Sequence, residues 1–467
     1  MQLTGMHYFS LIVVLLLSFV PGLYVGRKVK SADDYNVGGR KSGVFLVAGG
    51  IFSTAIGGAA TVGTAQMAFN YGLCSWWFTI AIGLSLICMG LFYAKPLRRS
   101  GLTTISEFMV NNFGEKAGPI TSITASMGIF FSIVASCLTV FHLLVGLFHS
   151  GNLLTAGVIL IIVLASVFLG GINSSGMGGL FKAGLLLSTL FVAGVFAYSE
   201  VGGITGLHAQ FSPFPWFSFW GRGVETGIYS CFSVLVGIIC TQSYIQAVFS
   251  AKDSKTAAHG CILAGILVIP VGIPAMFIGM FMRVTNPDIL PIDALPLYFI
   301  NYLPPWLGGA ALTGIIISAI GSIAGLALGC GTMISNDVFG KFAGIKDSVK
   351  LLLINRLAVL TITILSLFFV MYNLNSYVLT WTYFSMALRA SGIFLPLTFA
   401  IIFKGKISHS WGVVAMAAGI FIALTWKFFV PTANYTLFQS LVANLIFLIP
   451  AVIFAKKQRE RKTCIKK

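Results

Sequence analysis

A run of small residues interrupts an apolar segment near the start of the chain. Residues 52–72 read FSTAIGGAATVGTAQMAFNYG, with a Gly-Gly-Ala-Ala run at 57–60 among hydroxyl-bearing residues. Inside a bilayer, backbone can leave the helical pattern only where protein or a water-filled cavity satisfies the freed groups, so an interrupted span indicates a binding site. Close packing of helices through small residues explains the same composition. From this segment alone, both interpretations are open.

A single arginine lies well inside a second apolar segment. Residues 381–400 read WTYFSMALRASGIFLPLTFA, with Arg389 near the centre. An arginine there costs at least ~2.5–3.5 kcal/mol on insertion scales, so it tends to face protein or a cavity. The planar guanidinium fork suits a carboxylate, which points to a small organic anion or an amino acid as the ligand. A structural contact with backbone carbonyls at a helix end is the alternative.

The residue types that carry catalysis show no recognisable spacing. The sequence has no Walker A, GxSxG or HExxH pattern, and its six histidines have no metal-ligand spacing. The eight cysteines lack CxxC or Cys/His spacing. We therefore expect no enzyme and no organic cofactor.

Composition decides the class of protein that must position these residues. Of the 467 residues, 57% are hydrophobic and 9% are charged, and the mean hydropathy is +0.95. A soluble domain could not hide that apolar surface, so the lipid bilayer is the expected environment. The net charge of +17 is spread over loops between the apolar segments, which argues against a nucleic-acid partner. No obligate protein partner is evident.

Windows of about 20 apolar residues predict an all-α polytopic membrane protein with about thirteen transmembrane helices. The predicted spans are 6–26, 44–69, 72–94, 118–148, 154–171, 180–200, 223–248, 258–282, 306–334, 350–372, 377–402, 411–430 and 434–455.

The basic residues predict the orientation of these helices. With the N-terminus outside, most of the 29 lysines and arginines fall in cytoplasmic loops or the basic C-terminal tail, and the outer loops carry only Arg222 and Arg283. The positive-inside rule therefore favours an outside N-terminus and a cytoplasmic C-terminus. The short loops suit a multi-pass protein of a prokaryotic plasma membrane.

Four segments resemble landmarks of the sodium:solute symporter family, in the family's order and spacing. They read SADDYNVGGRKSG, TTISEFMVNNFG, QSYIQAVFSAKDSKTA and ISAIGSIAGLALGCGTMISNDVF. The resemblance covers the chain up to about residue 405. It implies a leucine-transporter-type core of two inverted five-helix repeats, with one helix before the core and two after it.

This resemblance divides the chain into five parts. They are an N-terminal helix and cytoplasmic loop (1–43), the first inverted repeat (44–200), an outer loop (201–222), the second inverted repeat (223–402), and two C-terminal helices with a basic cytosolic tail (403–467). The first helix of each repeat contains glycine, at 57–58 in one and at Gly227 and Gly237 in the other. Matched interruptions are typical of inverted-repeat transporters.

The resemblance also implies a Na⁺ site. Carbonyls of Ser53 and Ile56 would face Ser318, Gly321 and Ser322, which fall at i, i+3 and i+4 on one helix face. A small hard cation takes oxygen ligands of this kind. The family usually has a hydroxyl residue where this chain has glycine at 321. Alternatively, the serines bond to backbone carbonyls one turn back in their own helix.

A second departure from the family concerns the same site. The family commonly reads LGGxxAxxxTDxxQ where this chain reads LGGINSSGMGGLFK, so the expected acid is Gly179 and the expected glutamine is Lys182. In some proton-coupled amino-acid transporters of the same core fold, a lysine on this helix occupies the sodium position. Lys182 is therefore a candidate ion substitute or gating residue. The alternative is that it snorkels to the cytoplasmic interface.

The substrate is expected at mid-membrane, beside the two interruptions. The resemblance, together with the arginine, gives the candidate positions Gly57, Gly58, Ala59, Ala60, Thr79, Thr241, Gln242 and Arg389. Few of these offer hydrogen bonds, and unpaired hydroxyls are costly in a dry pocket, so a sugar is disfavoured.

Together these observations predict a secondary active transporter that imports a small organic solute with Na⁺ by alternating access. Proton coupling or ion-independent transport through Lys182 is the closest alternative. A membrane-embedded solute sensor is a different class, because transporter-like domains of this family are found fused to histidine kinases. No kinase domain is recognisable in this sequence, which disfavours that reading.

Overall fold

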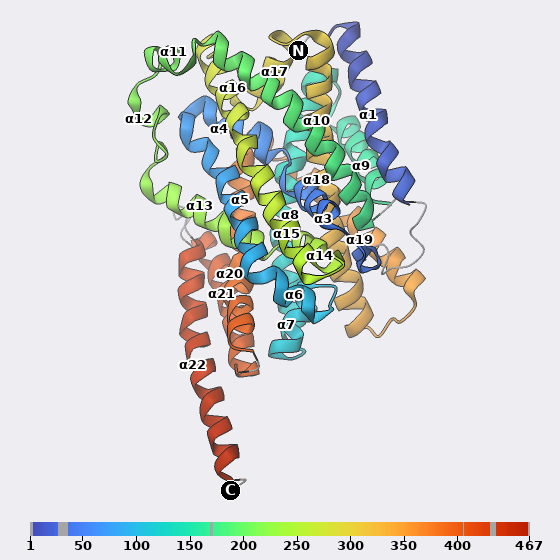
Figure 1. The fold of residues 1–467 in the computed structure, drawn as a ribbon, viewed down its shortest axis with the longest axis vertical. Coiled ribbons are helices and arrows are strands. Elements are labelled where there is room, and N and C mark those ends of the chain that lie inside the picture. Colours follow the sequence, from blue (N-terminus) through green and yellow to red (C-terminus); the bar gives the residue numbers. More distant parts are fainter. Residues whose placement is uncertain (1–2, 27–35, 169–170, 405, 430–435, 466–467) are drawn as a thin grey trace.

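The computed structural model describes all residues except 1–2, 27–35, 169–170, 405, 430–435 and 466–467. In the described part the chain is built from helices, and an isolated β-bridge pairs Ser42 with Ala251. The predicted all-α fold is therefore confirmed (Figure 1). Part of the predicted cytoplasmic loop within 1–43 lies outside the described residues.

The helices follow the predicted spans with several subdivisions. The N-terminal half contains α1 (Gly5–Gly26), η1 (Gly38–Arg40), α3 (Val44–Ala55), η2 (Ala59–Gly63), α4 (Thr64–Tyr71), η3 (Gly72–Trp76), α5 (Trp77–Cys88), η4 (Met89–Tyr93), α6 (Ala94–Ser100), α7 (Ile105–Phe113), α8 (Ala117–Phe148), α9 (Asn152–Phe168) and α10 (Gly171–Glu200). The C-terminal half contains α11 (Gly203–Gln210), α12 (Pro213–Trp216), α13 (Val224–Ile239), α14 (Gln242–Ser250), α15 (Ser254–Val268), η5 (Ile269–Val271), α16 (Gly272–Thr285), η6 (Pro291–Asp293), α17 (Ala294–Asn301), α18 (Pro305–Met333), η7 (Ile334–Phe342), α19 (Ser348–Met371), α20 (Val378–Ile402), α21 (His409–Phe429) and α22 (Thr436–Ile465).

Many of these helices can cross a membrane. Among the described residues, nine helical segments are long and apolar enough, and the bent pair α13 and α14 makes a tenth. Three further apolar helices in the described part are shorter, at Gly5–Ser18, Val44–Ala55 and Asn152–Ser166. The polytopic architecture agrees with the prediction, whereas the count of thirteen stays a prediction.

The first helix of each predicted repeat is interrupted. Helix α3 ends at Ala55 before η2 begins at Ala59, and α13 and α14 meet at an angle of 41° around Cys240 and Thr241. The second interruption therefore lies beyond Gly237, not at it. A Cβ on Gly237 would lie 2.7 Å from the Met386 Cα, so this glycine serves close packing of α13 against α20.

Helix α10 begins at Gly171, nine residues before the predicted span at 180. The glycine- and serine-rich stretch before residue 180 lowers the local hydropathy, which is why the apolar window missed it. In the structure this stretch packs against α3: a Cβ on Gly176 would lie 2.9 Å from the Leu46 carbonyl oxygen. Lys182 consequently lies inside a long helix and not near its end.

The interior is formed where α3, α8, α10, α18 and α20 pack on one another. Helices α21 and α22 pack together against α20, and α22 extends away from the bundle toward the C-terminus (Figure 1). Both interruptions therefore lie close to the interior helices α8, α18 and α20. The predicted repeat boundaries stay a prediction.

Candidate functional site

The interruption after α3 frees backbone carbonyls that face α18. Ile56 leaves the helical conformation, with φ −93° and ψ 96°. The Ser318 hydroxyl donates to the Ile56 carbonyl at 2.8 Å, and the Ser322 hydroxyl donates to the Thr54 carbonyl at 2.7 Å, with the Ser53 carbonyl at 3.3 Å. Both serines therefore bond across to the broken helix instead of back to their own helix.

Lys182 lies at the centre of this group. Its Nζ donates to the Ser53 carbonyl at 2.6 Å and to the Ser318 carbonyl at 2.8 Å. The residue is only 1% exposed, so the side chain does not snorkel to an interface. The ammonium thus occupies the space between α3 and α18 in which the family resemblance places Na⁺.

Two glycines make room for this lysine. A Cβ on Gly321 would lie 3.1 Å from the Ser53 Oγ, which is a tight contact, and 3.6 Å from the Lys182 Nζ, so a side chain at 321 would press on Ser53 beside the amino group. A Cβ on Gly179 would collide with the Gly49 carbonyl oxygen and lie 2.9 Å from the Ser53 Cβ. Both departures from the family pattern therefore suit the position of the lysine.

Gly57 and Gly58 act as contact points as well as a helix break. A Cβ on Gly57 would lie 2.8 Å from the Ser322 Cβ, and one on Gly58 would collide with Thr139 of α8. The two readings of this run, an interruption and a close helix contact, therefore apply together. These glycines bring the freed carbonyls within reach of α18.

The Lys182 amino group has no acid nearby in the described part of the chain. Within the described residues, the ion pair that joins a lysine to a carboxylate is Lys341 with Glu107, at 3.2 Å. No described carboxylate lies within 4.0 Å of the Lys182 Nζ. Carbonyl dipoles and the ammonium therefore satisfy each other, as they would around a bound monovalent cation.

A second buried cation, Arg389, lies at the other interruption. It is fully buried, and its Nη1 donates to the Thr241 hydroxyl at 2.6 Å. Its Nη2 lies 2.9 Å from both the Ser132 hydroxyl of α8 and the Ser385 hydroxyl of α20. The guanidinium therefore joins the break between α13 and α14 to α8 and α20.

Every hydrogen-bond partner found for Arg389 is neutral. The Nε donates to the Ser385 carbonyl at 3.3 Å, and no described carboxylate lies within 4.0 Å of the guanidinium. A guanidinium has five N–H donors in a planar fork that matches a carboxylate. Hydroxyl partners can turn away to admit an anion, so the group can recognise a carboxylate.

The other predicted substrate positions are divided among different interfaces. Ala59 and Ala60 are buried in η2, and the Thr79 hydroxyl donates to the Ile269 carbonyl at 3.2 Å, between α5 and η5. Gln242 accepts from the Ile105 N–H at 2.8 Å and so ties α14 to α7. Only Thr241 of the predicted substrate set contacts Arg389 directly.

Sequence reasoning included Thr241 but missed the other two hydroxyl groups around Arg389, those of Ser132 and Ser385. Ser385 precedes Arg389 by one helical turn, so helical spacing could have found it. Ser132 lies 257 residues away in the chain, and only the packing of α8 on α20 brings it to the guanidinium. A Cβ on Gly128 would collide with the Arg389 side chain, which explains a glycine one turn before Ser132.

Polar contacts also gather at the end of the bundle predicted to be cytoplasmic. The Gln246 amide donates to the Asn36 carbonyl at 2.6 Å and to Thr332 at 3.1 Å, and the Asn355 amide donates to Asn36 at 3.0 Å. These bonds join the loop before α3 to α14, α18 and α19.

Residues 35–419 match the model of the sodium:solute symporter family. The chain belongs to this family. The family and the relatives found are transporters and not enzymes.

Several relatives are named for choline or proline. The chain is 25% identical over 394 residues to a high-affinity choline transporter of Drosophila melanogaster, covering 76% of this chain and 61% of the relative. It is 28% identical to a human high affinity choline transporter, covering 58% of this chain and 49% of the relative. The osmoregulated proline transporter OpuE of Bacillus subtilis is 22% identical, covering 97% and 94%. The chain thus spans between about half and 61% of these choline transporters.

Solved structures share the fold. A Na⁺-coupled sialic acid symporter in a substrate-bound outward-open state matches with a TM-score of 0.81 and 18% identity, covering 97% of this chain and 98% of that chain. A nucleobase-cation-symport-1 family transporter in a closed conformation matches with a TM-score of 0.60 and 14% identity, covering 91% and 95%. These likenesses show the fold.

Proposed function

We propose that this transporter imports a small carboxylate-bearing solute by alternating access, with the Lys182 ammonium in place of a coupling Na⁺. One observation carries the proposal: the Lys182 Nζ lies 2.6 Å from the Ser53 carbonyl and 2.8 Å from the Ser318 carbonyl. These are distances of charge-assisted hydrogen bonds. The lysine and a sodium ion would compete for the same oxygens.

The Lys182 ammonium is covalently attached to the chain, and this limits the ways in which transport can be coupled to an ion gradient. A sodium ion can enter and leave the site, whereas the lysine can change the charge there only by gaining or losing a proton. Its hydrogen bonds hold α10 to α3 and α18, and they weaken when the charge is lost. Proton binding therefore favours the arrangement in which these helices are together, which is the differential affinity that coupling needs.

Sodium coupling is the second candidate, supported by the family itself and by the Na⁺-coupled symporter with the same fold. It requires the Lys182 side chain to leave the carbonyls of Ser53 and Ser318 in another conformation of the cycle. Sodium would then use the oxygens that the lysine vacates, together with the hydroxyls of Ser318 and Ser322.

Arg389 supports a carboxylate in the substrate. A choline headgroup carries a permanent positive charge, and a buried guanidinium without an acidic neighbour would repel it. An amino acid or small organic anion supplies the missing negative charge. The proline transporter among the relatives, which aligns over nearly the whole chain, is in keeping with an amino acid.

We further propose a plasma-membrane location with the N-terminus outside and the C-terminus in the cytoplasm. The distribution of lysine and arginine among the loops supports this orientation. Import then means movement from the side of the loop between α8 and α9 to the side of α7.

The test is transport by the purified protein in proteoliposomes. Counterflow with proline, choline and succinate first identifies an exchanged solute, and its uptake is then compared in Na⁺ and in N-methyl-D-glucamine at constant pH. Equal uptake in both buffers, with stimulation by an inward proton gradient, is the expected result. Uptake that depends on Na⁺ favours the second candidate. Binding of a solute without any exchange would instead indicate a sensor.

A further inference from the structure

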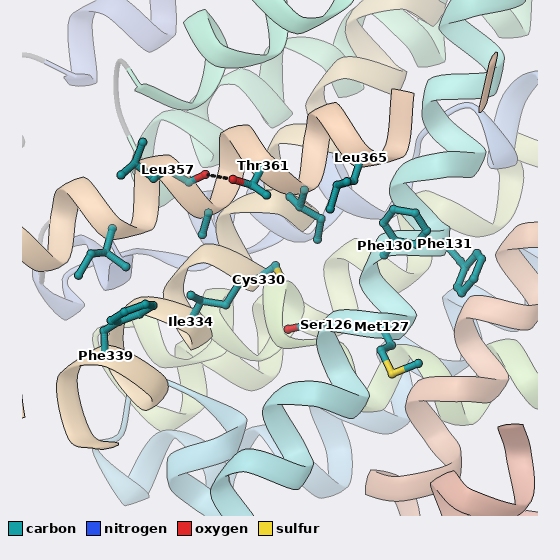
Figure 2. Close-up of a pocket in the computed structure, with 13 residues that line it drawn as sticks. Ser126, Met127, Phe130, Phe131, Cys330, Ile334, Phe339, Leu357, Thr361 and Leu365 are labelled. Carbon is teal, nitrogen blue, oxygen red and sulfur yellow. Dashed lines mark hydrogen bonds between the residues drawn. The ribbon is translucent and has the colours of Figure 1, made fainter. Parts of the chain in front are cut away.

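A wide groove runs between α8, the end of α18 with η7, and α19, away from the Lys182 and Arg389 sites. Its volume is about 720 Å³, within the range of ~300–1,000 Å³ that holds ligands in proteins. Figure 2 shows Leu357, Thr361 and Leu365 of α19 along the top, Phe130 and Phe131 of α8 on the right, and Phe339, Ile334 and Cys330 opposite the α19 residues.

The residues that line the groove favour an apolar ligand. The Thr361 hydroxyl already donates to the Leu357 carbonyl at 2.9 Å, so it presents no unsatisfied group to the groove. Phe130 and Phe131 line the groove and pack edge-on against Phe369, with ring centroids 5.8 and 5.9 Å away. Hydrocarbon fills such a space favourably, whereas a polar solute would lose hydrogen bonds there.

The groove opens toward the surroundings of the bundle. Leu357 and Leu365 line it and are 51% and 54% exposed, and both lie on α19, a candidate membrane span. In a bilayer these side chains face lipid. An acyl chain can therefore enter from the side without crossing a polar surface.

Positive charge lies at one end of the groove. Phe339 of η7 and Ile354 of α19 line that end, and the segment between them carries Lys346 and Lys350, both exposed. The neighbouring carboxylate of Asp347 accepts from the Val349 N–H at 2.9 Å and caps α19. Two exposed lysines therefore lie in the short segment that joins these two lining residues, which is on the predicted cytoplasmic side.

We propose that this groove binds one anionic phospholipid of the cytoplasmic leaflet, with an acyl chain along Phe130, Ile334 and Leu365 and its headgroup phosphate at Lys346 and Lys350. The combination of an apolar groove and a cationic rim between helices matches the two parts of such a lipid. A neutral zwitterionic lipid would fill the groove but gain less from the lysines. The site depends neither on the transported solute nor on the coupling ion.

The occupied groove would contact two helices that carry the transport site. Helix α18 bears Ser318 and Ser322, and α8 bears Ser132 beside Arg389. A bound acyl chain would therefore support the packing of α19 on both. Lipid dependence of transport follows from this placement.

Lipid binding to the detergent-purified full chain can be measured by native mass spectrometry with phosphatidylglycerol and phosphatidylcholine. We expect phosphatidylglycerol to bind about tenfold more tightly. Ala358→Trp fills the groove and should remove this binding. Leu353→Trp places the same ring on an exposed position of α19 outside the groove and is the matched control.

The double substitution Lys346→Gln and Lys350→Gln should reduce phosphatidylglycerol binding to the level of phosphatidylcholine while leaving thermal stability unchanged, because both side chains are exposed. Equal binding of the two lipids by the original protein would overturn the proposal. Unchanged phosphatidylglycerol binding in the Ala358→Trp protein would also overturn it. So would a groove-dependent cross-linked dimer, since a second copy would then be the occupant.

Discussion

At the scale of single residues, Lys182 and Gly321 change the chemistry of one site together. A larger residue at 321 would press on the Ser53 hydroxyl beside the ammonium, and a smaller or neutral residue at 182 would leave the Ser53 and Ser318 carbonyls without their cation. Hydrogen bonds to charged groups contribute about 1.5–3 kcal/mol each. The pair is therefore best altered jointly.

The double variant Lys182→Gln with Gly321→Ser restores the family residues at both positions. We expect it to gain sodium-stimulated uptake, about tenfold over uptake in N-methyl-D-glucamine, because the oxygens at Ser53, Ile56, Ser318 and the new hydroxyl become free for Na⁺. Lys182→Gln alone should lose most uptake. The measurement is initial-rate uptake in proteoliposomes, with the exposed Lys116→Gln as the control. A double variant indifferent to Na⁺ would count against the shared site.

Arg389 permits a second prediction at this scale. Arg389→Lys keeps the charge but loses the planar fork, so we expect the KM for a carboxylate substrate to rise about tenfold, equivalent to about 1.4 kcal/mol. Thermal stability separates this role from a structural one. Unchanged KM together with a lowered melting temperature would mean that Arg389 only ties Thr241 to Ser132 and Ser385.

Part of this chemistry could be predicted from the sequence and part could not. The family resemblance placed Ser53, Ile56, Ser318 and Ser322 together, and helical spacing supported the two serines. The sequence could not decide whether the Lys182 side chain reaches the ion site or the membrane interface. The predicted span began at residue 180, which placed Lys182 near a helix end, whereas α10 begins at Gly171. Ser132 was out of reach for any local pattern, since its contact depends on which helix faces α20.

At the scale of elements, the contact between α10 and α3 positions the lysine. Gly176 and Gly179 bring the two backbones together, and Gly49 provides the matching space on α3. Residues 171–179 are weakly hydrophobic, so the predicted span began at residue 180. In the structure these residues form the first turns of α10. Small residues at a helix contact lower the hydropathy and at the same time allow close approach in a membrane.

Adjacent glycines in α10 test this contact. A Cβ on Gly179 would strike the Gly49 carbonyl oxygen, whereas a Cβ on Gly178 meets nothing within 4 Å. We therefore expect Gly179→Ala to cost about 1–3 kcal/mol by overpacking and to abolish uptake, since Lys182 and Ser53 move apart. Gly178→Ala should change stability by no more than about 0.5 kcal/mol. Thermal unfolding in detergent and uptake are the measurements, and equal effects of the two substitutions would contradict the proposed contact.

At the scale of the whole molecule, composition alone was enough to predict a polytopic membrane protein, because a chain with this hydropathy has no soluble alternative. Composition does not give the number of spans, since α3 and α9 are short and α13 bends into α14. Polar contacts occur near both predicted membrane surfaces: Asn70 donates to the Tyr377 hydroxyl at 2.9 Å, and Gln242 accepts from the Ile105 N–H at 2.8 Å. Alternating access requires that such contacts break on one side at a time.

The orientation of the bundle can be tested on intact cells. The positive-inside rule places the loop between α8 and α9 outside and the start of α19 inside. Asn152→Cys and Ser348→Cys introduce thiols at exposed positions of these two regions. A membrane-impermeant maleimide added outside should label Asn152→Cys in intact cells and Ser348→Cys only after permeabilisation, with the unsubstituted protein as background. The opposite pattern would place Lys346 and Lys350 outside, and would make the proposed direction of import and the cytoplasmic-leaflet lipid wrong together.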